Sequence, residues 1–539
     1  MLYADDILLV IRGHKTKKLH RNLQHAVDSV DEWSKSVGFA ISATKSQIFY
    51  CSPNLRRDIA GSITIDGAVL QQTKQLKILG VTIDRTLNFK AHCKQVKKAC
   101  VPRIRILKII GAQLPRGKRT TLLQVGSAIV TSKLTYGIGL VSRGGQKALQ
   151  TLAPEYNQMI RFASGAFITS PIHSIMAESG TLPFDLLAVQ TITRIAIRLL
   201  EKDRNNDNLP LIRRVSEYIQ QKTGTPLPKI EQLQRRNDRE WQAPKPKIVW
   251  DIKKIIKAGD PPEKVRPVMQ QLLSDRFQQS TTAYTDGSKC EDTVGAGVYS
   301  INTTNKCSLP KHCSVFSAEA YALKMALSIT NDSELAIFTD SASCLLALEA
   351  GNSKHPWIQE VENLARRKTV QFCWIPGHAG IKGNTEADRL ANEAMRHPSI
   401  DIPIPAEDAI RSMKESIRLH WDNQWFVSRD AKLREIKNDT RKWTERNNAA
   451  DQRVLTRLRI GHTRLTHAFR LKKEGPPRCE CCDDTVDVKH MLLHCRKYDV
   501  ERQEHGIDTT SLGNTLNNLE ENETKLLNFL RQTGLYKQL

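Results

Sequence analysis

The features that would mark a membrane-spanning or secreted protein are missing from this chain of 539 residues. It has no stretch of about 18 consecutive apolar residues, so hydropathy gives no support for a transmembrane helix. It begins Met-Leu-Tyr-Ala-Asp-Asp, with carboxylates where an export signal has basic and then apolar residues. We therefore expect an intracellular protein of the nucleus or cytoplasm, not secreted and not bound to a membrane, whose 12 cysteines are mostly reduced thiols.

Acidic residues are also in short supply, because 57 Asp and Glu stand against 81 Lys and Arg, a net charge of +24. Such an excess favours a nucleic acid as the partner over an anionic membrane surface, although solvated surface lysines would give the same count. The excess is uneven: residues 281–398 carry a net charge of −2 and the rest of the chain +26. This contrast predicts basic flanks that hold a nucleic acid and a central segment that holds a chemical site.

The densest basic stretch runs from Lys74 to Arg119, where 13 Lys or Arg residues accompany a single acid, Asp84. Four of these lysines recur at helical spacing, and on one helix face they would form a strip that neutralises phosphates. They are Lys90, Lys94, Lys97 and Lys98. We predict that this strip binds the nucleic-acid backbone.

Hydrophobic periodicity divides the chain into successive segments. Short apolar runs between turns predict strands and a helix over 19–37 up to about residue 84, followed by mainly helical patterns to about residue 200. Prolines mixed with charges between residues 226 and 267 predict a linker. A strand-rich and then helical block follows at 281–396, with further helices predicted at 406–426 and 450–471.

Carboxylates in the 281–396 block stand at predicted strand ends and helix starts. Hydrolysis of a phosphodiester requires an activated water and a partner for the leaving oxygen, which two magnesium ions held by several carboxylates supply. Ser317 would cap the helix that carries the second acid, and residues 295–299 would pair with the strand that carries the first. Each acid alone is typical of a turn or a helix-dipole partner, so the prediction depends on the set. The set is Asp286, Glu319, Asp340 and Asp388.

This order of acids, with Trp374-Ile-Pro-Gly-His-Ala-Gly380 before the last of them, resembles the ribonuclease H family. The resemblance implies an α/β domain with a mixed five-stranded sheet and flanking helices. It implies that the four acids hold two Mg²⁺ ions, or Mn²⁺ in their place, and cut the RNA strand of an RNA–DNA hybrid. His378 would lie on a mobile loop and assist proton movement or product release.

The first residues resemble another enzyme. Tyr3-Ala-Asp-Asp6 between apolar runs, with Leu79-Gly-Val-Thr-Ile-Asp84 further on, is similar to the palm of retroelement reverse transcriptases. The resemblance implies Asp5 and Asp6 as polymerase metal ligands and a thumb-like helical region after residue 89. Such polymerases need a further Asp and fingers that would precede Met1, so we expect no polymerase activity from this chain.

A cluster of soft ligands lies near the other end. Two thiols, an imidazole and a third thiol follow the spacing of a closed tetrahedral zinc site, which is structural rather than catalytic. The set is Cys479, Cys482, His490 and Cys495, with Cys481 and His494 as alternative ligands. Upstream, arginines alternate with apolar residues and predict a helix with one cationic face, Arg459 among them. Together with Leu458-Arg-Ile-Gly-His-Thr463, this cluster resembles the carboxy-terminal region of non-long-terminal-repeat (LINE-like, I and Jockey-type) retrotransposon polyproteins.

These resemblances cover nearly the whole chain and define its expected organisation. We expect a partial reverse-transcriptase palm (1–88), a helical thumb or connection (89–225), a linker (226–280), a ribonuclease H domain (281–398), a helical basic region (406–475), a zinc knuckle (476–498) and a polar tail (499–539). The predicted function is RNA–DNA hybrid endoribonuclease activity within a truncated retrotransposon polyprotein. The alternative is a catalytically silent retroelement relic that only binds nucleic acid.

Overall fold

The computed structural model describes residues 2–3, 6–51, 61–113, 118–142, 146–202, 209–234, 245–256, 260–329, 334–428 and 432–539. The chain divides into two compact units. Unit 1 combines Met1–Thr191 with Trp421–Leu539, and unit 2 is Ile192–His420. None of the helices in the described residues combines the length and apolar character that a bilayer-spanning helix requires.

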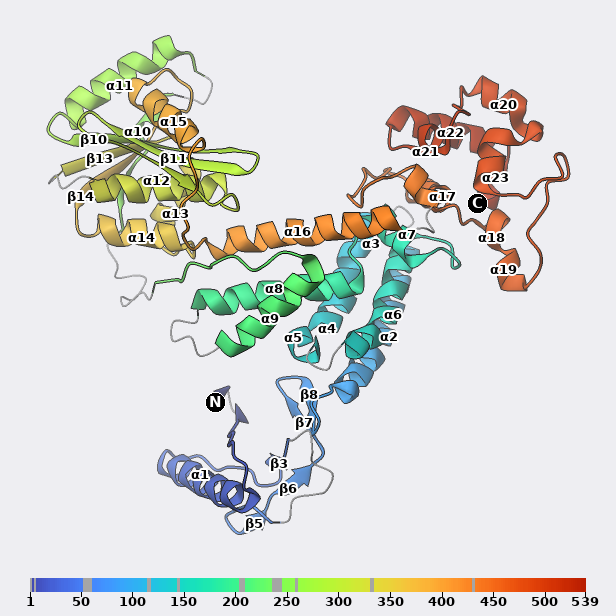
Figure 1. Ribbon diagram of the computed structural model, residues 1–539, viewed down its shortest axis with the longest axis horizontal. Coiled ribbons are helices and arrows are strands. Elements are labelled where there is room, and N and C mark those ends of the chain that lie inside the picture. The colour runs from blue at the N-terminus through green and yellow to red at the C-terminus, as the bar shows by residue number, and fades with distance from the viewer. Residues whose placement is uncertain are drawn as a thin grey trace. The chain divides into compact units, whose positions relative to one another are not determined.

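A mixed sheet forms the centre of unit 2 (Figure 1). In the described part of the chain this sheet has six strands in the order β12-β11-β10-β13-β14-β9. The hairpin β10–β11–β12 is antiparallel, and β10, β13, β14 and β9 run parallel to their neighbours. The strands are β9 (Lys247–Val249), β10 (Thr281–Cys290), β11 (Thr293–Ser300), β12 (Thr304–Leu309), β13 (Glu334–Thr339) and β14 (Thr369–Trp374).

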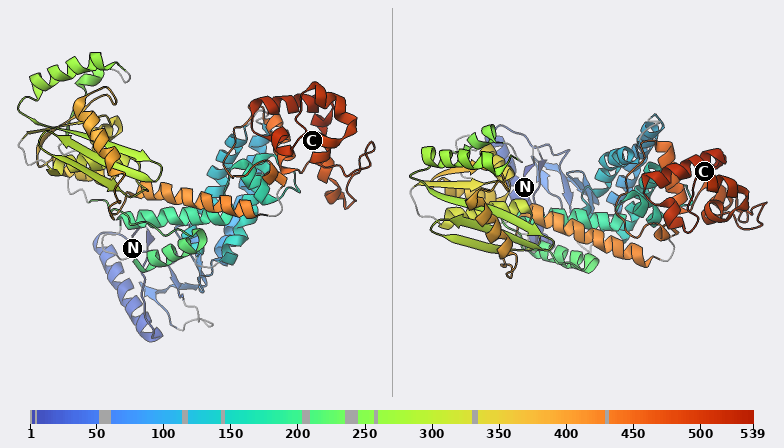
Figure 2. Two further views of the ribbon diagram at one scale, coloured as in Figure 1. Left: turned by 45° about the horizontal axis from the view of Figure 1, so that its top comes forward. Right: turned by 90° about the horizontal axis from the view of Figure 1, so that it is seen from above.

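Helices cover both faces of this sheet (Figures 1 and 2). Helix α12 lies over Gly287 on one face, because a Cβ on that glycine would stand 2.4 Å from the Glu319 nitrogen. Helix α15 lies over Gly295 and Gly297 on the other face, where a Cβ would stand 2.0 and 2.3 Å from helix carbonyl oxygens. The helices of this part are α9 (Leu209–Thr223), α10 (Asp251–Ile255), α11 (Pro262–Arg276), α12 (Val315–Ile329), α13 (Ala342–Ala350), α14 (Pro356–Ala365), α15 (Lys382–Ala394) and α16 (Ala406–Val427).

The predicted linker and the predicted five-stranded sheet both need correction. Strand β9 lies within the expected linker 226–280, pairs with β14 and gives the sheet its sixth strand. Helices α10 and α11 follow it, and Phe277 packs edge-on against Phe338 of β13. The prolines misled the prediction because Pro261 and Pro262 precede and begin α11, positions where a missing N–H costs nothing.

Unit 1 begins with short strands and a long amphipathic helix around a small apolar core. Val27, Ile48, Ile63, Ile65 and Leu70 are buried in that core. The elements are β1 (Leu2–Tyr3), β2 (Asp6–Ile7), α1 (Thr16–Ser36), β3 (Gln47–Phe49), β4 (Thr64–Ile65), β5 (Ala68–Val69), β6 (Gln71–Thr73), β7 (Gln75–Ile78) and β8 (Val81–Asp84). Residues 75–84 form the antiparallel hairpin β7–β8.

Helices follow from residue 90, as the periodicity predicts. Helix α2 contains Pro102 yet continues to Gln113, with its apolar face buried in the unit 1 core. The elements are α2 (Lys90–Gln113), α3 (Arg119–Gly126), the π-helix η1 (Ser127–Thr131), α4 (Ser132–Thr135), α5 (Ile138–Val141), α6 (Gln146–Ser164), α7 (Ile172–Ser179) and α8 (Phe184–Lys202).

The segment 499–539 is folded, which corrects the prediction of a polar tail. Its helices share a hydrophobic core with α17 and with the cysteine-rich segment, through Leu455, Leu492, Leu516 and Phe529 among others. The elements here are η3 (Lys432–Glu435), α17 (Ala449–Ile460), α18 (Arg464–His467), α19 (Phe469–Lys472), η4 (His490–His494), η5 (Arg496–Tyr498), α20 (Asp499–Glu504), α21 (Leu512–Leu516), α22 (Glu520–Gln532) and α23 (Leu535–Gln538).

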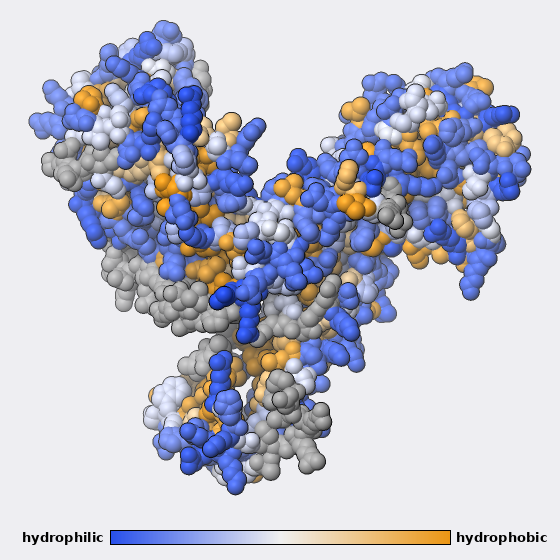
Figure 3. Space-filling model, in the orientation of Figure 1, coloured by the Kyte–Doolittle hydropathy of each residue, from blue (hydrophilic) through white to orange (hydrophobic). Residues whose placement is uncertain are grey.

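Hydrophilic side chains dominate the molecular face drawn in Figure 3, and the hydrophobic patches between them are small. This surface agrees with the excess of Lys and Arg in the sequence.

Candidate active site and metal centres

Two of the predicted acids meet because their strands are parallel neighbours. Thr285 of β10 pairs with Thr339 of β13, so Asp286 and Asp340, one position further along each strand, lie side by side at the same edge of the sheet. The two strands of a parallel pair run in the same direction, so the residues that follow a paired position on each strand are also adjacent. Asp340 directly follows the end of β13, as expected for a strand-end acid, whereas Asp286 lies in the middle of β10.

Glu319 reaches this edge from α12. The helix starts at Val315, earlier than expected, and its N-cap is Ser314 rather than Ser317. Gly287 makes the approach feasible, since any side chain there would collide with the backbone of Ala318 and Glu319. A glycine next to Asp286 thus reflects close packing of the helix on the strand and not a turn.

The three carboxylates form one cluster, in which Asp286 and Glu319 are buried and Asp340 is half-buried. One oxygen from each of Asp286, Glu319 and Asp340 lies within 4.8 Å of the other two. Asp286 is 8% exposed and Glu319 is 6% exposed, and Glu319 Oε2 has no hydrogen-bond partner among the residues that the structure describes.

Burial disfavours the charged form of these carboxylates, and acids this close together repel one another when no cation is bound, so their pKa values are raised. Burial, Asp340 and Asp388 raise the pKa of Asp286 to about 7. Burial, Asp286 and Asp340 raise the pKa of Glu319 well above its usual value. An oxygen-only donor set that is buried, anionic and short of partners matches the preference of Mg²⁺ or Mn²⁺. The described residues at this edge therefore fit a divalent cation.

The fourth predicted acid stands beside the cluster on α15. Gly295 and Gly297 of β11 let this helix lie directly on the sheet, which brings Asp388 near the strand edge. Asp388 is not within the group of three, and its Oδ1 accepts a hydrogen bond of 2.8 Å from Asn392. Its negative charge nevertheless raises the pKa of both Asp286 and Asp340.

Around Asp340, a loop and a helix start add further polar contacts. Burial raises the pKa of Asp340, while the Asn384 amide, 3.4 Å from Oδ2, and the nearby His378 oppose the rise. His378 is exposed and has a φ of 54°. Gly377 permits this loop to pass the acid, because a Cβ there would stand 2.7 Å from Asp340 Oδ2.

The predicted soft-ligand set also converges. One ligand atom from each of the four residues lies within 4.8 Å of all the others: Cys479, Cys482, His490 and Cys495. His490 Nε2 is buried and has no hydrogen-bond partner in the described part of the chain, and His490 Nδ1 lies 3.6 Å from Asp484 Oδ2. Three thiols and an imidazole with one free nitrogen fit tetrahedral zinc.

The alternative soft ligands are placed differently. Cys481 and His494 are both exposed and are absent from the converging group. The π-helix η4 explains the choice, because it buries His490 at its start and is followed directly by the buried Cys495.

The structure agrees only in part with the predictions for the polymerase residues and for the basic strip. Asp5 lies outside the described residues, and Asp6 is exposed on β2, which pairs with β1 as a hairpin. Three of the four lysines are exposed along α2, whereas Lys97 is half-buried and pairs with Glu155 at 3.6 Å.

The prediction that Arg459 lies on an exposed cationic helix face is wrong. Its side chain is fully buried, 2.7 Å from Glu523 and 3.7 Å from Glu178.

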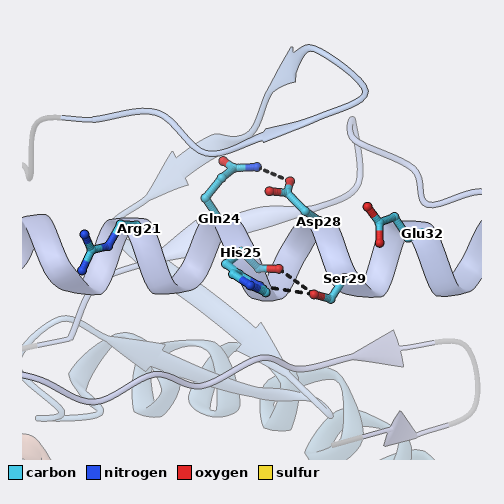
Figure 4. A pocket seen from close by; sticks show the side chains of 6 residues that line it. All are labelled: Arg21, Gln24, His25, Asp28, Ser29 and Glu32. Carbon is cyan, nitrogen blue, oxygen red and sulfur yellow. Dashed lines mark hydrogen bonds between the residues drawn. The ribbon is translucent and has the colours of Figure 1, made fainter.

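A pocket along α1 does not bring together residues from different elements as the two clusters above do (Figure 4). Its six lining residues all come from successive turns of that helix, and two pairs of them bond to each other, Gln24 with Asp28 and Ser29 with His25.

Sequence reasoning missed some residues that shape the carboxylate site. They include Asn384, whose amide lies 3.4 Å from Asp340 Oδ2, and Gly287, which lets α12 lie close to β10. The repeated glycines of β11 were available as a signal of close helix packing, whereas no local pattern distinguishes the Asn384 contact.

Comparison with known proteins agrees with this geometry. The model of the RNase H family matches residues 278–396, and that of the reverse transcriptase (RNA-dependent DNA polymerase) family matches residues 1–83. The Pol polyprotein of equine infectious anemia virus (strain Wyoming) is 35% identical over 117 residues, which are 20% of this chain and 10% of that protein.

Two insect proteins match longer segments. The RNA-directed DNA polymerase from mobile element jockey of Drosophila funebris is 27% identical over 164 residues, 30% of this chain and 18% of that protein. The probable RNA-directed DNA polymerase from transposon BS of Drosophila melanogaster is 26% identical over 157 residues, 28% of this chain and 17% of that protein. The matches thus span between a tenth and a fifth of these relatives.

The two family matches come in the order reverse transcriptase and then RNase H, and mobile-element polymerases are among the relatives. The chain therefore resembles LINE-like retrotransposon polyproteins, with a segment similar to reverse transcriptases followed by a ribonuclease H-like domain.

Proposed function

We propose that unit 2 cuts the RNA strand of RNA–DNA hybrids, with Asp286, Glu319, Asp340 and Asp388 holding two Mg²⁺ or Mn²⁺ ions. The observation that carries this proposal is the convergence of three carboxylates, two of them buried, at one sheet edge, with Asp388 beside them. Bound ions at this site would supply an acidified water for attack at phosphorus and would neutralise charge on the departing 3′ oxygen.

The side chains then have separate roles. Asp286 would help to hold the ions together with Asp340 and Asp388, which are both near enough to raise its pKa. Asn384 orients Asp340 through its amide, and Gly287 fixes the distance from Asp286 to α12. His378, exposed on its loop near Asp340, is placed to accept or release a proton during departure of the product.

The test is cleavage of a hybrid labelled separately on each strand. We expect Mg²⁺-dependent cuts in the RNA strand alone, because 2′-hydroxyls distinguish that strand from DNA. A purified, folded chain that binds the hybrid without cutting it would instead support the alternative of a silent nucleic-acid-binding protein.

We also infer that Cys479, Cys482, His490 and Cys495 hold one structural zinc ion. The free, buried Nε2 of His490 among three thiols carries this inference. Cys482→Ser should lose zinc, whereas the matched Cys481→Ser should retain it, because Cys481 is exposed outside the group. Metal analysis of both variants decides, and equal zinc contents would reject the ligand assignment.

A further inference from the structure

Helix α16 begins ten residues after the ribonuclease H family match ends at residue 396, yet its first turns contact the same domain. Asp408 is 2% exposed, and its Oδ2 accepts a hydrogen bond of 3.1 Å from the backbone N–H of Ser314. Ser412 Oγ lies 2.6 Å from His312 Nδ1. Two contacts therefore tie α16 to the loop that precedes α12.

Ser314 is the residue at which α12 begins. Its Oγ accepts a hydrogen bond of 3.1 Å from the Ser317 N–H, and its carbonyl accepts one of 2.9 Å from the Ala318 N–H. The N–H of Ser314 itself lies outside the hydrogen bonds that a helix makes within its own turns. Asp408 supplies a buried hydrogen-bond partner for that N–H. Its negative charge also stabilises the helix, because it lies near the positive N-terminal end of the helix dipole.

A second contact holds the same turn from another side. Ser317 Oγ lies 3.0 Å from Nε2 of His355, whose other ring nitrogen accepts a hydrogen bond from Ile358 at the start of α14. Burial lowers the pKa of His355 to about 4, so near neutral pH the ring acts as an uncharged hydrogen-bonding group. On the opposite side, Gly287 leaves no room between α12 and β10.

Glu319 follows directly on this turn, and its carboxylate must meet those of Asp286 and Asp340. A shift of the helix start would move Glu319 along or away from the strand edge, and metal ligands tolerate only about 0.5 Å of such displacement.

We propose that Asp408 is a positioning residue of the carboxylate site: it holds the start of α12 so that Glu319 stays within ligand distance of Asp286 and Asp340. This inference rests on the proposed function, because it assigns Asp408 to the same site. Asp408 acts through the backbone of Ser314 and makes no contact with the reacting atoms. It lies beyond the segment that the family model covers.

The test is Mn²⁺ binding to the full chain, prepared with zinc and without nucleic acid, followed by electron paramagnetic resonance. Asp408→Ala should weaken Mn²⁺ binding by about tenfold, the usual effect of losing an outer partner of a metal ligand. Asp408→Asn should bind Mn²⁺ as the wild type does, because an amide oxygen can still accept the Ser314 bond. The matched control is Asp401→Ala, whose exposed carboxylate pairs with Lys229.

Hybrid cleavage provides a second readout: Asp408→Ala should raise the Mg²⁺ concentration for half-maximal rate and leave KM for the hybrid unchanged. If Asp408→Ala fails to fold, Asp408→Glu, which moves the carboxylate by one methylene, should show the same weakening. Wild-type Mn²⁺ affinity in the folded Ala or Glu variant would overturn the inference, as would an Asn variant as weak as Ala. A wild-type chain that binds Mn²⁺ but cuts no hybrid would refute the proposed function alone.

Discussion

At the scale of single residues, the raised pKa of Asp286 links the carboxylate site to the stability of the folded protein. Its pKa rises from 3.8 to about 7 because the carboxyl is buried beside two other acids. Between these pH values the folded, metal-free protein keeps a proton that the unfolded chain has released. Raising the pH through this window therefore destabilises the folded state.

We expect the metal-free protein to melt at a lower temperature at about pH 7.5 than at about pH 5.5, by an amount that Asp286→Asn reduces. Mg²⁺ should raise the melting temperature more at the higher pH, because there it replaces charge repulsion with coordination. Thermal melting of the wild type and the Asn variant, with and without Mg²⁺, measures both effects. A Mg²⁺ stabilisation that is equal at the two pH values would contradict this account of the cluster.

At the scale of single elements, α2 shows that lysines at helical spacing in the sequence are not all exposed on one surface. Lys90, Lys94 and Lys98 follow one another at intervals of four and are exposed, whereas Lys97 turns toward Glu155 on α6. The sequence predicts the helix and its lysines, but the partner of Lys97 comes from a different helix and leaves no local signal.

Replacing Lys90, Lys94 and Lys98 together by Gln should weaken binding to duplex or hybrid and lower the slope of log affinity against log salt by roughly two to three, since each neutralised phosphate contributes about 0.9. Lys97→Gln is the matched control and should change the slope little. Binding titrations at several salt concentrations test this expectation. If the triple variant keeps the wild-type slope, these lysines do not contact phosphates.

The elements of the ribonuclease H sheet could be predicted because strand ends, glycines and acids stand close together in sequence. Strand β9 could not, since it has only Lys247–Val249 to mark it and depends on pairing with β14. The helices after residue 499 were hidden by polar residues that surround a few core positions such as Leu516 and Phe529. In both cases a distant partner decides the structure of a weakly patterned segment.

At the scale of the whole molecule, unit 1 is built from two separate stretches of the chain, with unit 2 between them in sequence. A buried network of charges joins the stretches. Glu178 of α7 lies 3.2 Å from Arg119 and 3.7 Å from Arg459, and Arg459 also pairs with Glu523 of α22. A linear series of domains was the natural expectation, because no local pattern links Glu178 to Arg459.

Glu178→Gln should destabilise unit 1 by about 1.5–3 kcal/mol, because two buried guanidinium groups lose their shared acid and keep only Glu445 and Glu523 as partners. Hydrogen exchange of the peptides that contain α3, α7 and α17 should accelerate together. Glu521→Gln, which removes an exposed acid paired with Lys525, is the control and should leave exchange unchanged. Unaltered exchange in α17 of the Glu178 variant would show that the network does not hold the two stretches together.

The most direct test of the central claim is hybrid cleavage by Asp340→Asn in the full chain, with Glu386→Gln as the matched control. Asp340 belongs to the converging group of three carboxylates, whereas Glu386 pairs with Arg389 on α15. The account predicts that Asp340→Asn loses all but a small fraction of the Mg²⁺-dependent cutting of the RNA strand, and that Glu386→Gln keeps the wild-type rate. Near-full cleavage by folded Asp340→Asn protein would show that the carboxylate cluster is not the active site.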